Sequence, residues 1–174
     1  MPSIIVVDYD PMWPVLYEEE RARIQALIGD YIEEIQHMGS TSVPGLGAKP
    51  IIDIMVVIRS LDLVEHTVQP LASISYEYHG EYGIPGRHLF SKPAGVSSFD
   101  HTHHLHMIER SHPQREYHLL FRDYLRGHPE AAREYNELKK ALAVKFGADR
   151  TGYTNAKTDF IASILAQARA ERSV

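Results

Sequence analysis

The sequence predicts a single α/β (α+β) domain over residues 1–174, with a mixed β-sheet flanked by helices and a helical layer at the C-terminal end. Three observations predict this fold. A short β-branched apolar run near residue 50 is typical of a buried strand. Residues 75–109 lack helical periodicity and are divided by glycines and prolines, which indicates strands and turns. Beyond residue 111, apolar residues recur at helical spacing along most of the remaining chain.

The first forty residues are expected to contribute a helix and two strands. Residues 3–7 are apolar and β-branched, which favours a short strand. Asp10 and Pro11 have the pattern of a helix N-cap followed by proline at the first helical position. Gly29 is expected to close this helix, and residues 31–38 are predicted to form the first core strand. The apolar residues at helical spacing are Trp13, Leu16, Tyr17, Ile24, Leu27 and Ile28.

The middle of the chain is expected to supply the rest of the sheet. Residues 50–58 form the β-branched apolar run, which only the carboxylate of Asp53 interrupts. Ser60 is a candidate N-cap for a helix that Pro70 bends or ends. The region rich in glycine and proline is predicted to form antiparallel strands at about 75–79, 86–92 and 98–109.

Three helices are predicted at the C-terminal end. Ser111 and Gln114 stand at capping-box spacing before the first helix, which is expected to end near Gly127. The second helix is expected to end at Gly147, and the third contains residues 160–168. The apolar stripe of the first helix is expected to pack in the core and consists of Tyr117, Leu120, Phe121, Tyr124 and Leu125.

The composition excludes several classes of function. The chain has no cysteine, which excludes disulfides and thiolate metal sites and favours a cytoplasmic location. The net charge of -5 argues against sequence-independent nucleic-acid binding, which needs a basic face. No apolar run approaches the length of a membrane span, and the N-terminus lacks the pattern of a signal peptide. We therefore expect a cytoplasmic protein without a membrane partner.

The main functional pattern lies between residues 37 and 57. Gly39, Ser40, Thr41 and Ser42 predict a turn whose backbone N–H groups and hydroxyls can hold a phosphate. The alternative is an ordinary turn held by local hydroxyl bonds. The carboxylate of Asp53, inside an apolar strand, is costly unless it is paired, coordinated or hydrogen-bonded. Together, turn and carboxylate suggest a site where a phosphate and a metal ion meet.

These residues resemble a known family. In the nucleotidyltransferase-fold superfamily, a Gly-Ser pair precedes a carboxylate-bearing strand, as Gly39-Ser40 precedes Asp53 here with twelve residues between Ser40 and Asp53. Longer segments are similar to the GrpB family, which is assigned to that fold. These segments are Trp13, His37–Leu46, Lys49–Asp53, His104–His106, Phe121–Arg126 and Tyr153–Lys157. The resemblance implies a nucleotidyltransferase-like sheet, nucleotide binding and, for an enzyme, nucleotidyl transfer.

One position departs from the superfamily pattern. A second carboxylate is expected two residues after the first, but this chain has Met55 there. Thioether sulfur is a poor ligand for magnesium, so a two-metal site cannot be built from this strand alone. Asp53 remains the candidate catalytic residue, as ligand of one Mg²⁺ or Mn²⁺ ion or as a base for an attacking hydroxyl. The alternative is a structural carboxylate bonded to turn amides.

Histidines cluster between residues 101 and 118. In a strand, His104 and His106 share one face. If that strand lies beside the Asp53 strand, the three side chains make a two-histidine, one-carboxylate site for zinc or another transition metal. Asp100 has the same parity and is a spare carboxylate. The alternative is two histidines satisfied by hydrogen bonds in a polar cleft.

Basic residues are candidate phosphate contacts. Lys49 and Arg87 are expected to bind the phosphate or to offset the charge of a leaving pyrophosphate. Lys139 is expected on a solvated surface. Tyr153 and Lys157 belong to a segment similar to the GrpB family and are candidates to close over the cleft.

Three functions are compatible with these patterns. The first is binding of a phosphate-bearing small molecule, preferentially a nucleotide, with a divalent cation and with nucleotidyl transfer as the implied reaction. The second is a non-catalytic binding or accessory module that has lost a metal-binding carboxylate. Relatives in which a GrpB-like domain is fused to dephospho-coenzyme A kinase are compatible with that role. The third is a histidine-based metalloprotein.

Overall fold

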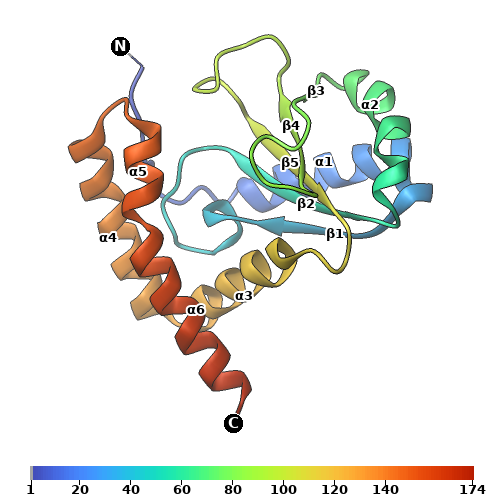
Figure 1. Cartoon of the computed structure of the whole chain (residues 1–174). Helices are drawn as coiled ribbons and strands as arrows, with labels where there is room; N and C mark the ends of the chain where they lie inside the picture. Colours follow the sequence, from blue (N-terminus) through green and yellow to red (C-terminus); the bar gives the residue numbers. More distant parts are fainter. Residues whose placement is uncertain (1) are drawn as a thin grey trace.

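The computed structural model describes residues 2–174. Its centre is a five-stranded mixed sheet with the strand order β1-β2-β5-β4-β3 (Figure 1). The strands are β1 (Ile32–Met38), β2 (Ile52–Ile58), β3 (Glu77–Tyr78), β4 (His88–Lys92) and β5 (His103–Ile108). The central strands β2 and β5 are parallel, and the other neighbouring pairs are antiparallel. The predicted mixed sheet is therefore confirmed.

Helices surround this sheet and confirm the predicted α/β class. They are α1 (Trp13–Ile28), α2 (Val64–Ala72), α3 (Pro113–Gly127), α4 (Pro129–Phe146), α5 (Arg150–Ala156) and α6 (Thr158–Arg172). Helices α1 and α2 pack on one face of the sheet, and α3 packs on the other. Helices α4, α5 and α6 form a separate layer beside the sheet (Figure 1). Among residues 2–174, no helix is both long and apolar enough to cross a membrane.

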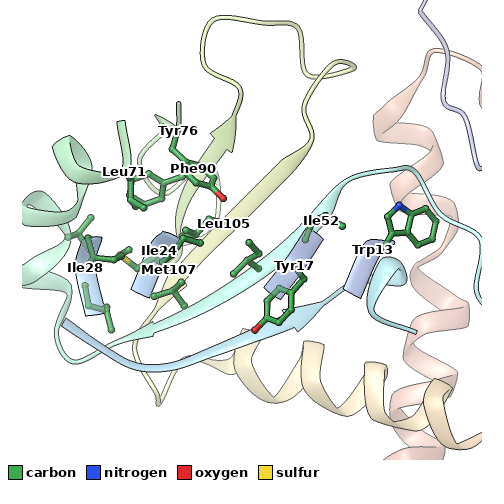
Figure 2. Close-up of a cluster of buried hydrophobic side chains, with 14 of the residues drawn as sticks. Trp13, Tyr17, Ile24, Ile28, Ile52, Leu71, Tyr76, Phe90, Leu105 and Met107 are labelled. Carbon is green, nitrogen blue, oxygen red and sulfur yellow. The ribbon is translucent and has the colours of Figure 1, made fainter. Parts of the chain in front are cut away.

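The alternation of side chains along β2 separates a core face from a functional face. Ile52, Ile54 and Val56 point into the largest apolar cluster, together with residues of α1, α2, β4 and β5 (Figure 2). The residues between them must point to the opposite face, because successive side chains of a strand alternate. Met55 packs there under α3, and Asp53 is its neighbour on the same face.

The helical layer is joined to the sheet through the loop that precedes β2. Val43 and Leu46 of this loop pack against apolar side chains of α3, α4 and α6. Two arginines of α3 reinforce the joint: Arg122 donates to the carbonyl of His37, and Arg126 donates to the carbonyl of Ser42. These bonds bring the C-terminal helices against the Gly39–Ser42 turn.

Several predicted boundaries were wrong. Residues 3–7 form no strand; they contribute one bridge, between Val7 and Ala48. The strands after residue 75 are shorter than predicted, because turns and loops take up more of this region than its glycines and prolines indicated. The C-terminal end contains four helices instead of three, since α5 precedes the predicted third helix.

Helix caps also differ from the sequence predictions. The Asp10 carboxylate accepts from the Met12 amide at 2.8 Å, so Asp10 stabilises the turn before α1, which begins at Trp13. Ser60 accepts from Asp62 and caps a short 3₁₀ turn that leads into α2. Before α3, the imidazole of His112 accepts from Gln114 and replaces the predicted Ser111 cap.

Candidate functional site

A cavity of about 380 Å³ lies where the functional face of the sheet meets the helical layer. Its floor is formed by β2 and β5, and its walls come from the Gly39–Ser42 turn and from α3, α4, α5 and α6. The polar and aromatic residues that line it are Ser40, Thr41, Lys49, Asp53, His104, His106, Tyr117, His118, Phe121, Tyr135, Lys139, Tyr153, Thr154 and Lys157. Of the described residues, Asp53 alone contributes a carboxylate to this lining.

The Gly39–Ser42 turn has the backbone that its glycine predicts. Gly39 adopts φ 74°, a conformation that side-chain-bearing residues rarely adopt. A β-carbon at Gly39 would also lie 2.6 Å from the carboxylate of Asp53. Glycine therefore permits both the turn and its close approach to Asp53.

The hydroxyls of this turn are only partly available to a ligand. The Thr41 hydroxyl lies 2.9 Å from the His37 imidazole, and the Ser42 hydroxyl donates to the carbonyl of Gly39. Ser40 and Thr41 line the cavity, whereas Ser42 does not. The structure thus combines a locally bonded turn with a cavity wall made of Gly39, Ser40 and Thr41.

Asp53, His104 and His106 come together because β2 and β5 are parallel neighbours. Asp53 pairs directly with His104 in the register, and His106 is two residues further along the same face. The Asp53 Oδ1 atom lies 3.7 Å from His104 Nδ1 and 3.4 Å from His106 Nε2. One potential ligand atom from each of the three residues lies within 4.8 Å of the others. This spacing is compatible with a single metal ion.

The hydrogen bond at the far ring nitrogen decides whether His104 or His106 can ligate a metal. The Nε2 atom of His104 lies 3.1 Å from His101 Nδ1, so His104 can donate there and keep the Nδ1 lone pair beside Asp53. Such a bond on the far nitrogen is usual for metal-ligating histidines. Asp53 and His104 therefore fit a divalent cation. His106 is different, since its far nitrogen faces Arg87.

The other candidate carboxylates do not join this group. Asp100 precedes β5 and is absent from the cavity lining. The Met55 side chain is buried with Met38, Val57 and Ile108. Among residues 2–174, no second carboxylate lines the cavity to replace the one missing from the superfamily pattern.

Electrostatics keep the group in a defined charge state. Burial acts to raise the pKa of Asp53, but the nearby imidazoles of His106, His104 and His118 outweigh it and hold the pKa below its usual range. Burial lowers the pKa of His104 and of His118 to about 4. At neutral pH, Asp53 is thus a carboxylate beside the neutral imidazoles of His104 and His118, which can ligate a metal or form hydrogen bonds.

Three lysines, Lys49, Lys139 and Lys157, bring positive charge into the same cavity. Burial and the charges of the other two lysines lower the pKa of Lys139 to about 7, and burial and Lys49 lower that of Lys157 to about 8. Burial also lowers the pKa of Lys49. None of the three takes part in the salt bridges formed by residues 2–174.

The position of Lys139 corrects the prediction of a solvated surface residue. Its side chain is 3% exposed and its ammonium group donates to the carbonyl of Gly47. The helical period explains the burial, because Lys139 shares the inner stripe of α4 with Tyr135 and Leu142. That spacing was visible in the sequence, but the charge of the residue suggested the opposite face.

Some of the remaining candidate residues line the cavity, and others lie behind the residues that line it. Lys49, Tyr153 and Lys157 line the cavity, with the Lys157 ammonium 4.3 Å and the Lys49 ammonium 5.4 Å from the centre of the Tyr153 ring. Arg87 lies outside the lining, behind His106. His118 was missed, although it belongs to the same run of histidines, because its place on the inner face of α3 depends on how that helix packs.

Comparisons with known proteins identify the family. The family model described as GrpB protein matches residues 3–167, so the chain belongs to the GrpB family. It is 36% identical over 164 residues to "Glutamate-rich protein GrpB" of Alkalihalophilus pseudofirmus, covering 94% of each chain. The crystal structure of conserved protein GrpB from Enterococcus faecalis superimposes with a TM-score of 0.86 at 35% identity, covering 98% of this chain and 100% of that chain. The mixed sheet and its helices are consistent with the nucleotidyltransferase superfamily.

Other relatives are longer than this chain. It is 39% identical to "UPF0157 protein YqkA" of Bacillus subtilis over 91% of its own length but only 45% of that protein. A protein of Mycobacterium tuberculosis named "Dephospho-CoA kinase" is 28% identical over 83% of this chain and 39% of its own length. GrpB-like sequence therefore occurs inside larger proteins.

Proposed function

We propose that the cavity binds a phosphate-bearing small molecule, preferentially a nucleotide, together with a divalent cation at Asp53 and His104. One observation carries the proposal: three lysines converge on a cavity that contains a single carboxylate. Ammonium groups that are partly or fully buried without ion pairs are unfavourable unless an anion approaches them. A polyphosphate is an anion of suitable charge for such a set.

Each part of the cavity has a role in this binding. Lys49, Lys139 and Lys157 neutralise phosphate oxygens, and the Gly39–Thr41 wall approaches the ligand with little side-chain bulk. A cation at Asp53 and His104 supplies further charge neutralisation at the phosphoryl oxygens. The aromatic rings of Tyr117 and Phe121 provide apolar surface for the remainder of the ligand.

Nucleotidyl transfer is the reaction that the superfamily implies for this site. An acceptor oxygen would bond to the α-phosphorus of a nucleoside triphosphate as the bond to the bridging oxygen breaks. Pyrophosphate would leave, and the acceptor proton would pass to water. The lysines would stabilise the charge on the leaving group. Magnesium or manganese is the expected cation.

Two other functions remain distinct alternatives. The buried Met55 favours a non-catalytic nucleotide-binding or accessory module, because the second metal-binding carboxylate is missing. The matching region is 39% of the relative named "Dephospho-CoA kinase", so GrpB-like sequence forms only a part of that protein, which is compatible with that role. The cluster of Asp53, His104 and His106 instead favours a metalloprotein that holds zinc or another transition metal.

A thermal-shift screen on metal-stripped protein separates the three. Nucleotides and inorganic pyrophosphate would each be tested with magnesium, manganese, zinc or no metal. A ligand at one hundred times its dissociation constant should stabilise the fold by about 2.7 kcal/mol. Stabilisation by a nucleotide with magnesium or manganese supports the proposal. Stabilisation by zinc alone supports the metalloprotein, and an absence of stabilisation by every ligand contradicts the proposed function and favours the accessory module.

Matched variants then test the site. Asp53→Asn should abolish the metal-dependent part of nucleotide binding with little loss of stability. Lys157→Met should weaken nucleotide binding by about tenfold or more, since bonds to charged groups contribute about 1.5–3 kcal/mol. Lys140→Met is the control, because Lys140 lies on α4 outside the cavity and pairs with Asp8. Equal weakening by both lysine variants would contradict the assignment.

A further inference from the structure

Arg87 contacts His106 from the side opposite to the cavity. The guanidinium Nη1 atom lies 3.1 Å from His106 Nδ1. The Nη2 atom donates to the carbonyls of Tyr82, at 3.1 Å, and Glu81, at 3.4 Å. The Arg87 residue is 8% exposed. These contacts fix the guanidinium against the imidazole.

This contact determines where His106 carries its proton. A guanidinium has only donors and stays charged in proteins, so the Nδ1 atom of His106 must be the acceptor. A neutral imidazole that accepts at Nδ1 carries its hydrogen on Nε2. The cavity-side nitrogen of His106 is therefore an N–H donor, with no lone pair for a metal.

That donor forms no aligned hydrogen bond with any of residues 2–174. The Nε2 atom of His106 is buried and forms no hydrogen bond with any of residues 2–174. It lies 3.4 Å from Asp53 Oδ1, without the alignment of a hydrogen bond. His106 lines the cavity, so an oxygen of a ligand can reach this position. A buried donor without a hydrogen bond is unfavourable, which points to a ligand atom.

We propose that Arg87 holds His106 in its Nε2–H form and that His106 donates this hydrogen to a phosphate oxygen of the bound ligand rather than ligating the metal. The proposal rests on the phosphate-binding function proposed above. It makes His106 a ligand-binding residue and Arg87 a positioning residue that acts through it. The cation is then held by Asp53 and His104 alone.

This assignment also predicts a weak affinity of the cavity for zinc. A metal-ligating histidine usually donates its far N–H to a carboxylate, carbonyl or water. At His106 the far nitrogen meets a cation instead, so zinc at Nε2 would require displacement of Arg87. Two ligands are fewer than the three protein ligands typical of zinc sites, whereas magnesium keeps several waters and needs few protein ligands.

Nitrogen NMR of the whole protein tests the protonation directly. Labelled histidines would be assigned with the help of a His106→Gln sample, and the nitrogen that carries hydrogen would be identified from its shift and its couplings. Hydrogen on Nε2 of His106 at neutral pH is the expected result. Hydrogen on Nδ1 would overturn the proposal. The measurement itself uses the wild-type protein without a ligand.

Two substitutions at His106 test the donor. Glutamine can place an amide N–H near the position of Nε2, whereas leucine cannot donate. With inorganic pyrophosphate and magnesium in a calorimetric titration, His106→Leu should lower the affinity by about tenfold or more, and His106→Gln should recover most of this loss. Equal loss in the two variants would contradict a donor role.

Zinc titration tests the role of Arg87. Arg87→Met frees Nδ1 of His106 to carry hydrogen and Nε2 to bind metal, so zinc affinity should rise by about tenfold. Tight zinc binding by the wild-type protein that His106→Gln abolishes would overturn the proposal. If wild-type protein binds neither pyrophosphate nor nucleotides, the phosphate function and the donor role toward it both fail. The NMR and zinc results then still decide the tautomer and the metal set separately.

Discussion

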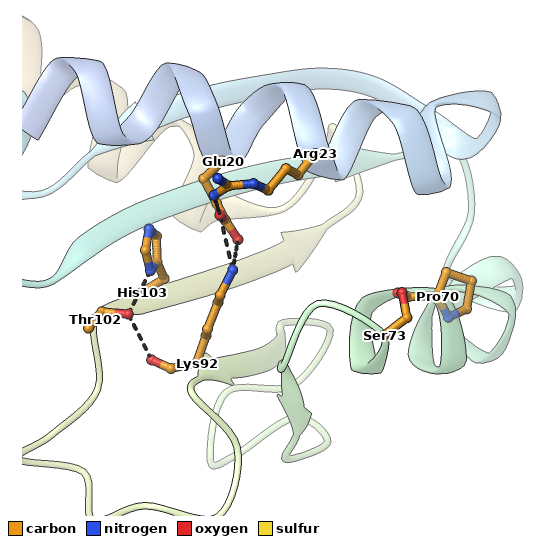
Figure 3. A network of polar contacts seen from close by, with 7 residues as sticks. All are labelled: Glu20, Arg23, Pro70, Ser73, Lys92, Thr102 and His103. Atoms are coloured by element: carbon orange, nitrogen blue, oxygen red, sulfur yellow. Dashed lines mark hydrogen bonds and ion pairs between the residues drawn. The ribbon is translucent and has the colours of Figure 1, made fainter.

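Both faces of the sheet carry buried charged side chains, but only one face pairs its cations with a carboxylate. On the face covered by α1, Glu20 is fully buried and binds Lys92 and Arg23 (Figure 3). The Lys92 ammonium lies 2.9 Å from Glu20 Oε1, and Arg23 Nη1 lies 3.0 Å from Oε2. On the opposite face, Asp53 lies beside the imidazoles of His104 and His106, and the lysines of the cavity form no ion pair among residues 2–174.

The difference separates a structural network from the proposed binding site. Burial acts to raise the pKa of Glu20, but hydrogen bonds from Lys92 and Arg23 outweigh it and hold that pKa below its usual range. Both carboxylate oxygens therefore have partners within the protein. In the cavity, the three lysines form no ion pair among residues 2–174, and the Nε2 atom of His106 forms no hydrogen bond there; the proposed ligand would supply both. Buried charge that is already paired indicates structure, whereas buried charge without a partner indicates function.

The largest expected loss of stability comes from a substitution that breaks the ion pairs of Glu20. Glu20→Ala leaves Lys92 without its partner and should lower the free energy of unfolding by about 3 kcal/mol, because removal of one member of a buried ion pair is strongly destabilising. Urea denaturation measures the loss. Glu19→Ala is the control, since Glu19 is exposed and should change stability by less than about 0.5 kcal/mol. Similar losses in both variants would show that the network is not structural.

A smaller effect is expected at the turn beside Asp53. Gly39→Ala should destabilise the protein by about 2 kcal/mol, because its backbone conformation is strained for alanine and the new methyl group collides with Asp53. Gly45→Ala is the matched control: Gly45 has φ 81° and open space around its β-position. It should cost about 1 kcal/mol from conformation alone and leave ligand binding intact. If calorimetry shows equal ligand binding in both variants, the turn does not shape the cavity.

The sequence predicted the local parts of the site better than their assembly. The strand around Asp53 and the shared face of His104 and His106 follow from composition and from the alternation of strands. Their closeness depends on β5 lying parallel to β2, a long-range pairing for which local pattern gives no register. The same limit applies to Arg87, which directly precedes the neighbouring strand β4 and contacts His106.

Predictions made from residue type were wrong where long-range packing decides the position of a side chain or segment. Lys139 was placed on the surface because lysine is rarely buried, although helical spacing aligned it with Tyr135 and Leu142. Residues 3–7 have strand-forming composition, but they find only one backbone bridge to the loop before β2. In both cases the neighbours that decide the outcome come from distant parts of the chain.

The smallest expected effect concerns the cavity face of the sheet, where a substitution should raise the free energy of unfolding instead of lowering it. Lys139→Met should raise the free energy of unfolding at pH 7 by about 1–2 kcal/mol, since it removes a buried cation that two other lysines repel. The pKa of Lys139 is about 7 in the folded protein, below its usual 10.5. Between these values the unfolded chain binds more protons, so wild-type stability rises with pH.

The advantage of Lys139→Met should therefore be complete below about pH 7 and shrink toward about pH 10, where the unfolded chain also loses this proton. Urea denaturation across that range measures it, and Lys140→Met should show no such dependence. Added pyrophosphate should stabilise the wild-type protein more than Lys139→Met, because the anion would supply the negative charge that the buried ammonium lacks among residues 2–174. A variant that is less stable than the wild type at every pH would place Lys139 with Glu20, as a structural charge, and would remove the contrast between the two faces.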